Sequence, residues 1–288
     1  MTDQLRPGEP CSIKLPYGEL AGLRWKNATQ PRVLALHGWL DNAASFVPLA
    51  EHLNGIDLIA LDFPGHGHSD WWSAGHYYHF LDYLWPVLDV ADQLGWQQFH
   101  LLGHSLGGAV AAMLAAALPE RILTLSAIDS FGPLSTAANA TRDNLRRALH
   151  SRNSYLERAS PSYPDIDSAS AARAKHGNLS LTAAELLVRR NLKQTEDGWQ
   201  LRTDPRLRRT SLFRFTEDQV MDLIARLTVP TTVILADKAK PDPWDSLLEQ
   251  RLPALQDCEI RTLPGHHHLH MESPGPVAEV IMARIHSR

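Results

Sequence analysis

Residues 103–108 read Gly103-His104-Ser105-Leu106-Gly107-Gly108, and they separate a mostly apolar run at 99–102 from an Ala-rich apolar run at 109–118. The first run is typical of a buried strand and the second of a buried helix. A G-x-S-x-G pattern between a strand and a helix is the context of a nucleophilic serine on a sharp turn. The turn requires glycine two positions either side of the serine, because side chains there would clash. We therefore predict that Ser105 is a nucleophile whose hydroxyl projects from the sheet.

The rest of the chain alternates short buried strands with amphipathic helices, which predicts an α/β fold with a mostly parallel central sheet flanked by helices. Strands are expected at 33–36, 56–61, 99–102, 122–128, 231–236 and 259–263, after an antiparallel hairpin of 12–15 and 20–25. Helices are expected at 46–53, 77–94, 109–118, 244–252 and 276–285.

The alternation is interrupted once. Residues from about 134 to 227 are rich in Ala, Arg and Leu, with helical periodicity and no convincing buried strand. We therefore divide the chain into a first core segment (1–132), a helical cap or lid (133–228) and a second core segment (229–288). No internal repeat accompanies this division.

Composition narrows the function classes. The 288 residues carry a net charge of −4, from 28 basic and 32 acidic side chains, without a long run of like charge. This argues against a nucleic-acid partner. The polar segment 1–10 lacks the apolar stretch of a secretory signal, and the longest apolar run, 109–118, is too short to span a bilayer. With two isolated cysteines, Cys11 and Cys258, expected to be reduced, the chain is predicted to be cytoplasmic with no membrane association. The composition leaves the oligomeric state open.

A second motif, His37-Gly38-Trp39, follows the first predicted parallel strand. Gly38 lets the main chain pass close to the serine, so the backbone N–H of Trp39 is free to donate. Together with the N–H of Leu106 it would form an oxyanion hole for a tetrahedral intermediate. His37 is interpreted as a structural hydrogen-bonding residue.

A serine nucleophile needs a general base, and histidine is the usual one near neutral pH. Four histidines follow the last predicted strand: His266, His267, His268 and His270. Clustered histidines can also bind a metal, but no Cys or Glu partner has obvious ligand spacing. We therefore predict neither a metal nor a cofactor, and the residues alone leave the choice of base open.

The combined motifs resemble the α/β-hydrolase superfamily, and especially its group of serine hydrolase-like proteins. The segments that carry the resemblance read His37-Gly38-Trp39-Leu40-Asp41-Asn42, Asp62-Phe63-Pro64-Gly65-His66-Gly67-His68-Ser69, Gly103-His104-Ser105-Leu106-Gly107-Gly108, Gly265-His266-His267 and Glu272-Ser273-Pro274. They cover both core segments, whereas the insertion matches only loosely. In this family the base precedes a Glu and an x-Pro at fixed spacing, and counting back from Glu272 and Pro274 implies His267.

The resemblance leaves the acid of the triad less clear. Many relatives have it after the strand that follows the cap, at a position that here is Ala239. Other relatives have it after the strand that precedes the cap, where this chain has Asp129. A buried carboxylate is needed to orient the histidine and to stabilise its protonated form. We favour Asp129, then Asp237 and then Asp242.

These residues predict a hydrolase that acts on a small-molecule carboxylic ester or related acyl compound, through an acyl-enzyme formed with Ser105, His267 and Asp129. Trp39, Phe63 and His104 are expected to contact the substrate. The alternatives are a C–C bond hydrolase or an acyltransferase on the same fold, or a ligand-binding module without turnover. The sequence does not identify the acyl group.

Overall fold

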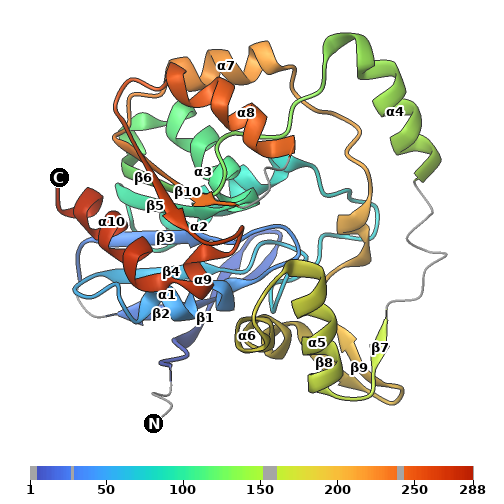
Figure 1. Cartoon of the computed structure of the whole chain (residues 1–288). Coiled ribbons are helices and arrows are strands. Elements are labelled where there is room, and N and C mark those ends of the chain that lie inside the picture. Colours follow the sequence, from blue (N-terminus) through green and yellow to red (C-terminus); the bar gives the residue numbers. More distant parts are fainter. Residues whose placement is uncertain (1–4, 27–28, 152–160, 239–242, 288) are drawn as a thin grey trace.

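The computed structural model describes the chain apart from residues 1–4, 27–28, 152–160, 239–242 and 288 (Figure 1). The strands are β1 (Glu9–Leu15), β2 (Gly18–Lys26), β3 (Arg32–Leu36), β4 (Asp57–Leu61), β5 (Phe99–His104), β6 (Ile122–Ile128), β7 (Ser162–Tyr163), β8 (Leu192–Thr195), β9 (Gly198–Leu201), β10 (Thr231–Asp237) and β11 (Cys258–Pro264). The α-helices are α1 (Val47–Ala50), α2 (Leu84–Gln93), α3 (Leu106–Ala117), α4 (Thr141–His150), α5 (Ile166–Gly177), α6 (Leu181–Asn191), α7 (Glu217–Ala225), α8 (Pro243–Arg251), α9 (Leu269–Glu272) and α10 (Pro274–His286). Short 3₁₀ helices are η1 (Ala43–Phe46), η2 (Phe80–Tyr83), η3 (Pro119–Arg121), η4 (Ala138–Ala140), η6 (Pro205–Arg208) and η7 (Leu252–Ala254).

The central sheet has eight strands in the order β1-β2-β4-β3-β5-β6-β10-β11. The hairpin β1–β2 is antiparallel and joins β4 antiparallel, whereas every pairing from β4 to β11 is parallel. This mostly parallel central sheet is the one that the sequence predicts. Because β6, β10 and β11 are neighbours, the loops that follow them meet at one edge of the sheet.

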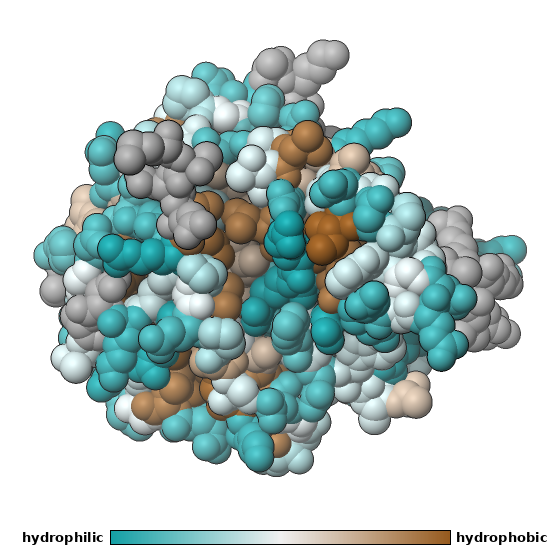
Figure 2. All heavy atoms as spheres, turned by 90° about the horizontal axis from the view of Figure 1, so that it is seen from below, coloured by the Kyte–Doolittle hydropathy of each residue, from teal (hydrophilic) through white to brown (hydrophobic). Residues whose placement is uncertain are grey.

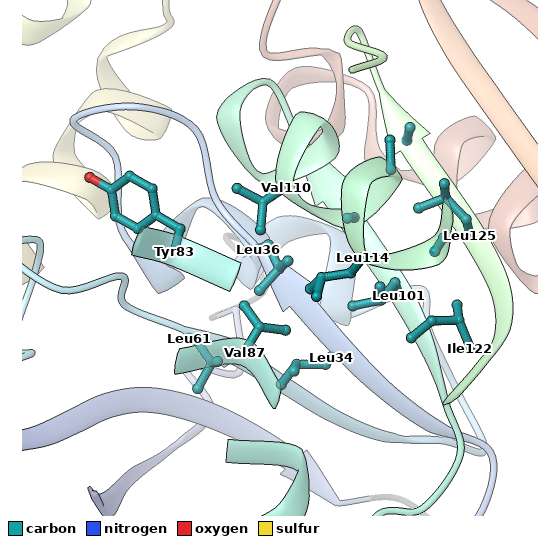
Figure 3. Packing of buried hydrophobic residues seen from close by; sticks show 14 of the residues in the cluster. Leu34, Leu36, Leu61, Tyr83, Val87, Leu101, Val110, Leu114, Ile122 and Leu125 are labelled. Atoms are coloured by element: carbon teal, nitrogen blue, oxygen red, sulfur yellow. The ribbon is translucent and has the colours of Figure 1, made fainter. Parts of the chain in front are cut away.

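Side chains on the two faces of the sheet form two hydrophobic cores, because alternate residues of a strand point to opposite faces. In β3, Leu34 and Leu36 belong to the core that includes side chains of α2, α3, α7 and α8, whereas Val33 and Ala35 belong to the core that includes side chains of α1, α9 and α10. Figure 3 shows the first of these cores, where Leu36 lies among Val110, Leu114 and Val87. Helices therefore cover both faces, and α3 is buried against the strand that precedes it.

Residues between β6 and β10 contribute α4, α5, α6 and α7 and, contrary to expectation, a small antiparallel sheet of β7, β9 and β8. These strands have two to four residues and are mostly half-buried. Such short strands leave no continuous apolar run, so the sequence pattern does not reveal them. Figure 1 shows α5, α6 and this sheet together at one side of the core, with α4 standing apart from them.

The predicted helix at 77–94 is shorter than expected. A 3₁₀ turn occupies Phe80–Tyr83, and α2 begins only at Leu84. Pro86 explains this start, because proline lacks an N–H and is tolerated in the first turn of a helix but not in its interior.

The surface seen in Figure 2 is largely hydrophilic, with hydrophobic patches of limited extent. None of the helices in the described part of the chain is both long and apolar enough to cross a membrane. Cys11 on β1 and Cys258 on β11 are both free thiols, at opposite edges of the sheet.

Candidate active site

The predicted nucleophile lies on a strained turn. Ser105 sits between the end of β5 and the start of α3 with φ 51° and ψ −115°, in the left-handed region that non-glycine residues rarely adopt. A Cβ on Gly103 would lie 2.4 Å from the carbonyl oxygen of Gly107, and one on Gly107 would lie 1.9 Å from that of Leu36. Both flanking glycines are therefore sterically required. The Ser105 N–H donates to the carbonyl of Ile128 at 3.1 Å, which joins this turn to the end of β6.

The loop that follows β3 runs beside the same turn. The carbonyl of His37 accepts the N–H of Gly107 at 3.0 Å. In the His37 ring, Nε2 accepts the N–H of Phe63 at 3.0 Å, so Nδ1 carries the proton and donates to the carbonyl of Gly38 at 2.7 Å. Burial lowers the pKa of His37 and keeps the ring neutral, as this pair of bonds requires. His37 therefore fixes the loop that leads to Trp39.

The two expected oxyanion donors are the N–H of Trp39, in the loop after β3, and the N–H of Leu106, the first residue of α3. Among the residues that the structure describes, neither the N–H of Trp39 nor that of Leu106 has a hydrogen-bond partner. The Trp39 side chain is 52% exposed, and its Nε1–H donates to the carbonyl of Leu207 in η6 at 3.2 Å. Its indole thus connects the core to the segment inserted between β6 and β10.

Of the four clustered histidines, His267 pairs with Asp129. Its Nδ1 lies 2.7 Å from Asp129 Oδ2. The Asp129 side chain is 1% exposed, whereas that of His267 is 39% exposed, so the ring reaches from a buried carboxylate toward solvent. His266 is exposed, and His268 and His270 are buried.

Asp129 is held in place by its backbone and by three donors. It has φ 48°, and its N–H donates to the carbonyl of Ile234 on β10 at 2.7 Å. Its Oδ1 accepts the Ala236 N–H at 3.1 Å, and its Oδ2 lies 3.0 Å from Lys238 Nζ as well as beside His267. Burial alone would raise the pKa of Asp129, but the hydrogen bonds from His267 and Ala236 and the charge of Lys238 hold it below its usual value. Asp129 is therefore an ionised carboxylate at neutral pH.

The two other candidates for the acid, Asp237 and Asp242, have no described contact with His267. Asp237 is the last residue of β10 and is exposed to solvent. Asp242 lies outside the described residues, as does Ala239. Among the described aspartates, Asp129 is the one whose carboxylate contacts His267.

The other two residues expected to contact the substrate, Phe63 and His104, are buried. Phe63 is 2% exposed and packs edge-on against His37, with ring centroids 4.9 Å apart, and against Tyr83 at 4.8 Å. His104 is fully buried, and its Nε2 donates to the carbonyl of His267 at 2.8 Å. Burial and the neighbouring histidines hold the pKa of His104 well below its ordinary value. Both side chains are therefore buried among core residues, and their contact with a substrate stays a prediction.

A buried ionic network that the sequence analysis did not identify lies behind His267. Asp41 is 2% exposed and accepts bonds from Arg173 of α5 at 2.6 Å and from His268 at 3.1 Å. Burial would raise the pKa of Asp41, but His268 and Arg173 hold it well below its usual value. Asp41 is part of the quoted His37-to-Asn42 motif, whereas Arg173 comes from a distant segment without any local signal.

This network also contains a set of metal-type donors. One donor atom each from Asp41, His104 and His268 lies within 4.8 Å of the others. The Arg173 guanidinium already lies 2.6 Å from Asp41 and 3.5 Å from Nε2 of His268. A cation in this place supplies the charge that a metal would bring, so the donor set fits an ionic network better than a metal centre.

A small cavity of about 50 Å³ lies elsewhere, lined by residues 77–79, 148–149 and 209–212. None of the expected catalytic residues contributes to its wall.

Comparisons with known proteins identify the family and several relatives of this chain. Residues 31–274 match the family model described as alpha/beta hydrolase fold. The chain is 30% identical to human serine hydrolase-like protein 2, over 98% of this chain and 96% of the relative, and 30% identical to a serine hydrolase-like protein of Dictyostelium discoideum, over 96% and 81%. The crystal structure of a hypothetical protein from Pseudomonas aeruginosa PAO1 superposes with a TM-score of 0.89 and 39% identity, covering 97% of this chain and 99% of that one. A shorter match, 36% identical over 40% of this chain and 38% of the relative, is to an esterase of Mycobacterium tuberculosis.

Proposed function

This chain belongs to the α/β-hydrolase superfamily and its serine hydrolase-like group, and from that premise we propose that it hydrolyses small-molecule carboxylic esters through a Ser105–His267–Asp129 triad. The observation that carries the proposal is the 2.7 Å contact between His267 Nδ1 and the buried carboxylate of Asp129. The esterase among the relatives supports an ester-type substrate.

In the proposed mechanism, the Ser105 hydroxyl attacks the carbonyl carbon of the ester while His267 Nε2 takes its proton. The backbone N–H groups of Trp39 and Leu106 hold the negative oxygen of the tetrahedral intermediate. The intermediate collapses to an acyl-enzyme when His267 returns the proton to the departing alcohol. Water, deprotonated by His267, then attacks the acyl carbon, and the acid is released when the bond to Ser105 Oγ breaks and His267 returns the proton to that oxygen. Asp129 stabilises the imidazolium that forms in both steps.

We further propose that residues 133–228 act as a cap between the core segments 1–132 and 229–288. Two ion pairs to buried core carboxylates support this role. Arg173 of α5 contacts Asp41 at 2.6 Å, and Arg190 of α6 contacts Asp62 at 2.8 Å. A cap held this way would exclude water and shape the pocket for the acyl group.

A fluorophosphonate probe tests the proposal, because it reacts covalently with an activated serine. We expect it to label the native chain at Ser105 and to block hydrolysis of p-nitrophenyl esters, and we expect Ser105→Ala to abolish both. Full ester turnover by Ser105→Ala would overturn the proposal. Tight binding of an ester without labelling or turnover would indicate a ligand-binding module instead. A panel of p-nitrophenyl esters of graded chain length then identifies the preferred acyl group.

A further inference from the structure

Lys238 follows β10 and lies against the proposed acid of the triad. Its Nζ is 3.0 Å from Asp129 Oδ2 and 2.8 Å from Oδ1 of Asp245 on α8. The lysine side chain is only 10% exposed. An ammonium ion so far removed from water depends on these carboxylates for its stabilisation. The contact is therefore a built feature of the site and not a surface ion pair.

The ammonium shares the oxygen that His267 uses. Asp129 Oδ2 faces both Lys238 Nζ at 3.0 Å and His267 Nδ1 at 2.7 Å, while Oδ1 accepts the Ala236 N–H at 3.1 Å. Ala236 near the end of β10 and Lys238 just after it therefore supply two of the three donors that hold this carboxylate. With both oxygens engaged, rotation of the carboxylate would break at least one bond, so its direction toward His267 is fixed.

A positive charge at this oxygen also changes how well the carboxylate stabilises protonated His267. The groups around the His267 ring are the Asp129 carboxylate, the rings of His104 and His268 at centroid distances of 4.7 and 5.3 Å, and Lys238 behind Asp129. His104 is buried and neutral, so Lys238 is the cation that offsets the Asp129 charge most directly. This offset weakens the attraction between the Asp129 carboxylate and the imidazolium that forms on His267.

We propose that Lys238 is a positioning residue that locks the Asp129 carboxylate onto His267 and extends the working range of the base toward acidic pH. The proposal rests on the Ser105–His267–Asp129 mechanism for its effect on rate. It also makes a claim about the titration of His267 that does not require turnover.

The size of the effect follows from the distances. The ammonium is separated from the imidazole by one carboxylate, about 5–6 Å, and His267 is 39% exposed, so an effective permittivity of about 40–80 applies. Removal of the charge should then move the acidic limb of the pH profile of kcat/KM upward by about 0.5–1 pH unit.

The experiment compares three variants in p-nitrophenyl acetate hydrolysis and in the pH dependence of fluorophosphonate labelling. Lys238→Met keeps the aliphatic stem and removes the charge, and we expect the upward shift in both assays, smaller at about 0.5 M salt because screening weakens the interaction. Lys238→Arg retains a cation and should keep the limb within about 0.3 unit of the native one. Lys26→Met is the matched control, because this exposed lysine at the end of β2 lies outside the site and should leave the limb unmoved.

A purely structural role predicts a different result. If Lys238 only anchors α8 through Asp245, then Asp245→Asn and Lys238→Met should lower stability and rate alike at every pH, with the acidic limb unmoved. That result, in Lys238→Met protein that still folds and reacts with the probe, would overturn the proposal.

A second readout separates this proposal from the proposed function. The ring of His267 is followed by NMR titration in a Ser105→Ala background, with its signal identified by its loss in His267→Gln. Lys238→Met should move the titration midpoint upward by the same amount, and an unmoved midpoint refutes the role of Lys238. Absence of labelling and turnover in the native chain refutes the proposed function instead, and the titration still decides the role of Lys238.

Discussion

Replacement of Asp129 by asparagine removes the charge behind His267 with little change in volume. The change is informative because the structure fixes both ends of this side chain: Oδ1 accepts the Ala236 N–H, and Oδ2 faces His267 and Lys238. An amide that keeps the Ala236 bond turns its NH₂ toward His267 and forces the proton onto the wrong ring nitrogen. An amide that flips keeps the His267 bond but directs its NH₂ at the Ala236 N–H. Either orientation breaks a bond that the carboxylate satisfies.

The magnitude follows from the charge lost. Protonated His267 and Asp129 have charge centres about 4 Å apart, and the Asp129 side chain is only 1% exposed, so an effective permittivity of about 20 applies. Their attraction is then about 4 kcal/mol, or roughly a 10³-fold loss in kcat when the carboxylate becomes an amide. The wrong tautomer brings the loss to about 10⁴-fold. We expect a result between these two values, with binding of the ester less affected.

The assay is steady-state hydrolysis of p-nitrophenyl acetate at saturating and at low substrate, with urea unfolding as the check on the fold. Asp237→Asn is the control, because this aspartate ends the adjacent strand and is exposed. It should retain activity within about threefold, which corresponds to less than 1 kcal/mol. If Asp129→Asn is folded and loses less than tenfold, or if Asp237→Asn shows the large loss, Asp129 is not the acid.

Two further predictions concern stability. Arg251 is fully buried, and its Nε and one Nη donate to the two carboxylate oxygens of Glu217 at 2.7 and 2.8 Å, while the other Nη donates to the carbonyl of Phe131 at 2.9 Å. Arg251→Met should therefore lower the free energy of unfolding in urea by about 3 kcal/mol. A loss under about 1 kcal/mol would contradict this prediction. His270 is fully buried, and desolvation lowers its pKa to about 3. At pH values below about 6.5 the unfolded chain therefore binds more protons at this residue than the folded protein does. The contribution of neutral His270 to stability is complete above about pH 6.5 and is lost as the pH falls toward 3. At pH 5 the loss of stability from His270 is about 2 kcal/mol relative to pH 7.5. His270→Phe should reduce the measured difference in unfolding free energy between these two pH values by that amount. An unchanged difference would show that His270 is not the group responsible.

The sequence was sufficient for the core of the fold and for the serine turn. Buried β-branched and Leu-rich strands that are separated by glycine turns and alternate with helices predict a parallel sheet covered by helices. The glycines predict the serine turn because Gly107 approaches Leu36 too closely for a side chain. The position of His104 was also predictable in retrospect. It is the residue of β5 immediately before Ser105, so the alternation of a strand directs its side chain away from the hydroxyl.

The sequence favoured Asp129 over Asp237, but it could not show which carboxylate contacts His267. Asp129 follows β6 and Asp237 ends the neighbouring strand β10, next to β11, whose following loop carries His267. The positive φ of Asp129 turns its side chain into the interior, and a positive φ at a residue other than glycine leaves no trace in the sequence. Lys238 and Arg173 went unnoticed for a related reason, since each makes its contact across more than a hundred residues.

Two buried aspartates contact neighbouring histidines of the 266–270 cluster, Asp129 the ring of His267 and Asp41 the ring of His268. Asp129 contacts Nδ1 of the His267 ring, whereas Asp41 lies beside His104 and His268. The ring of His104 in turn donates to the main-chain carbonyl of His267. A ring that is fixed at one end only could still rotate about its backbone. Because Arg173 of α5 also contacts Asp41, the proposed cap is attached to the aspartate that binds His268. Under that proposal, movement of α5 acts on Asp41, whereas the bond between His267 and Asp129 does not involve α5.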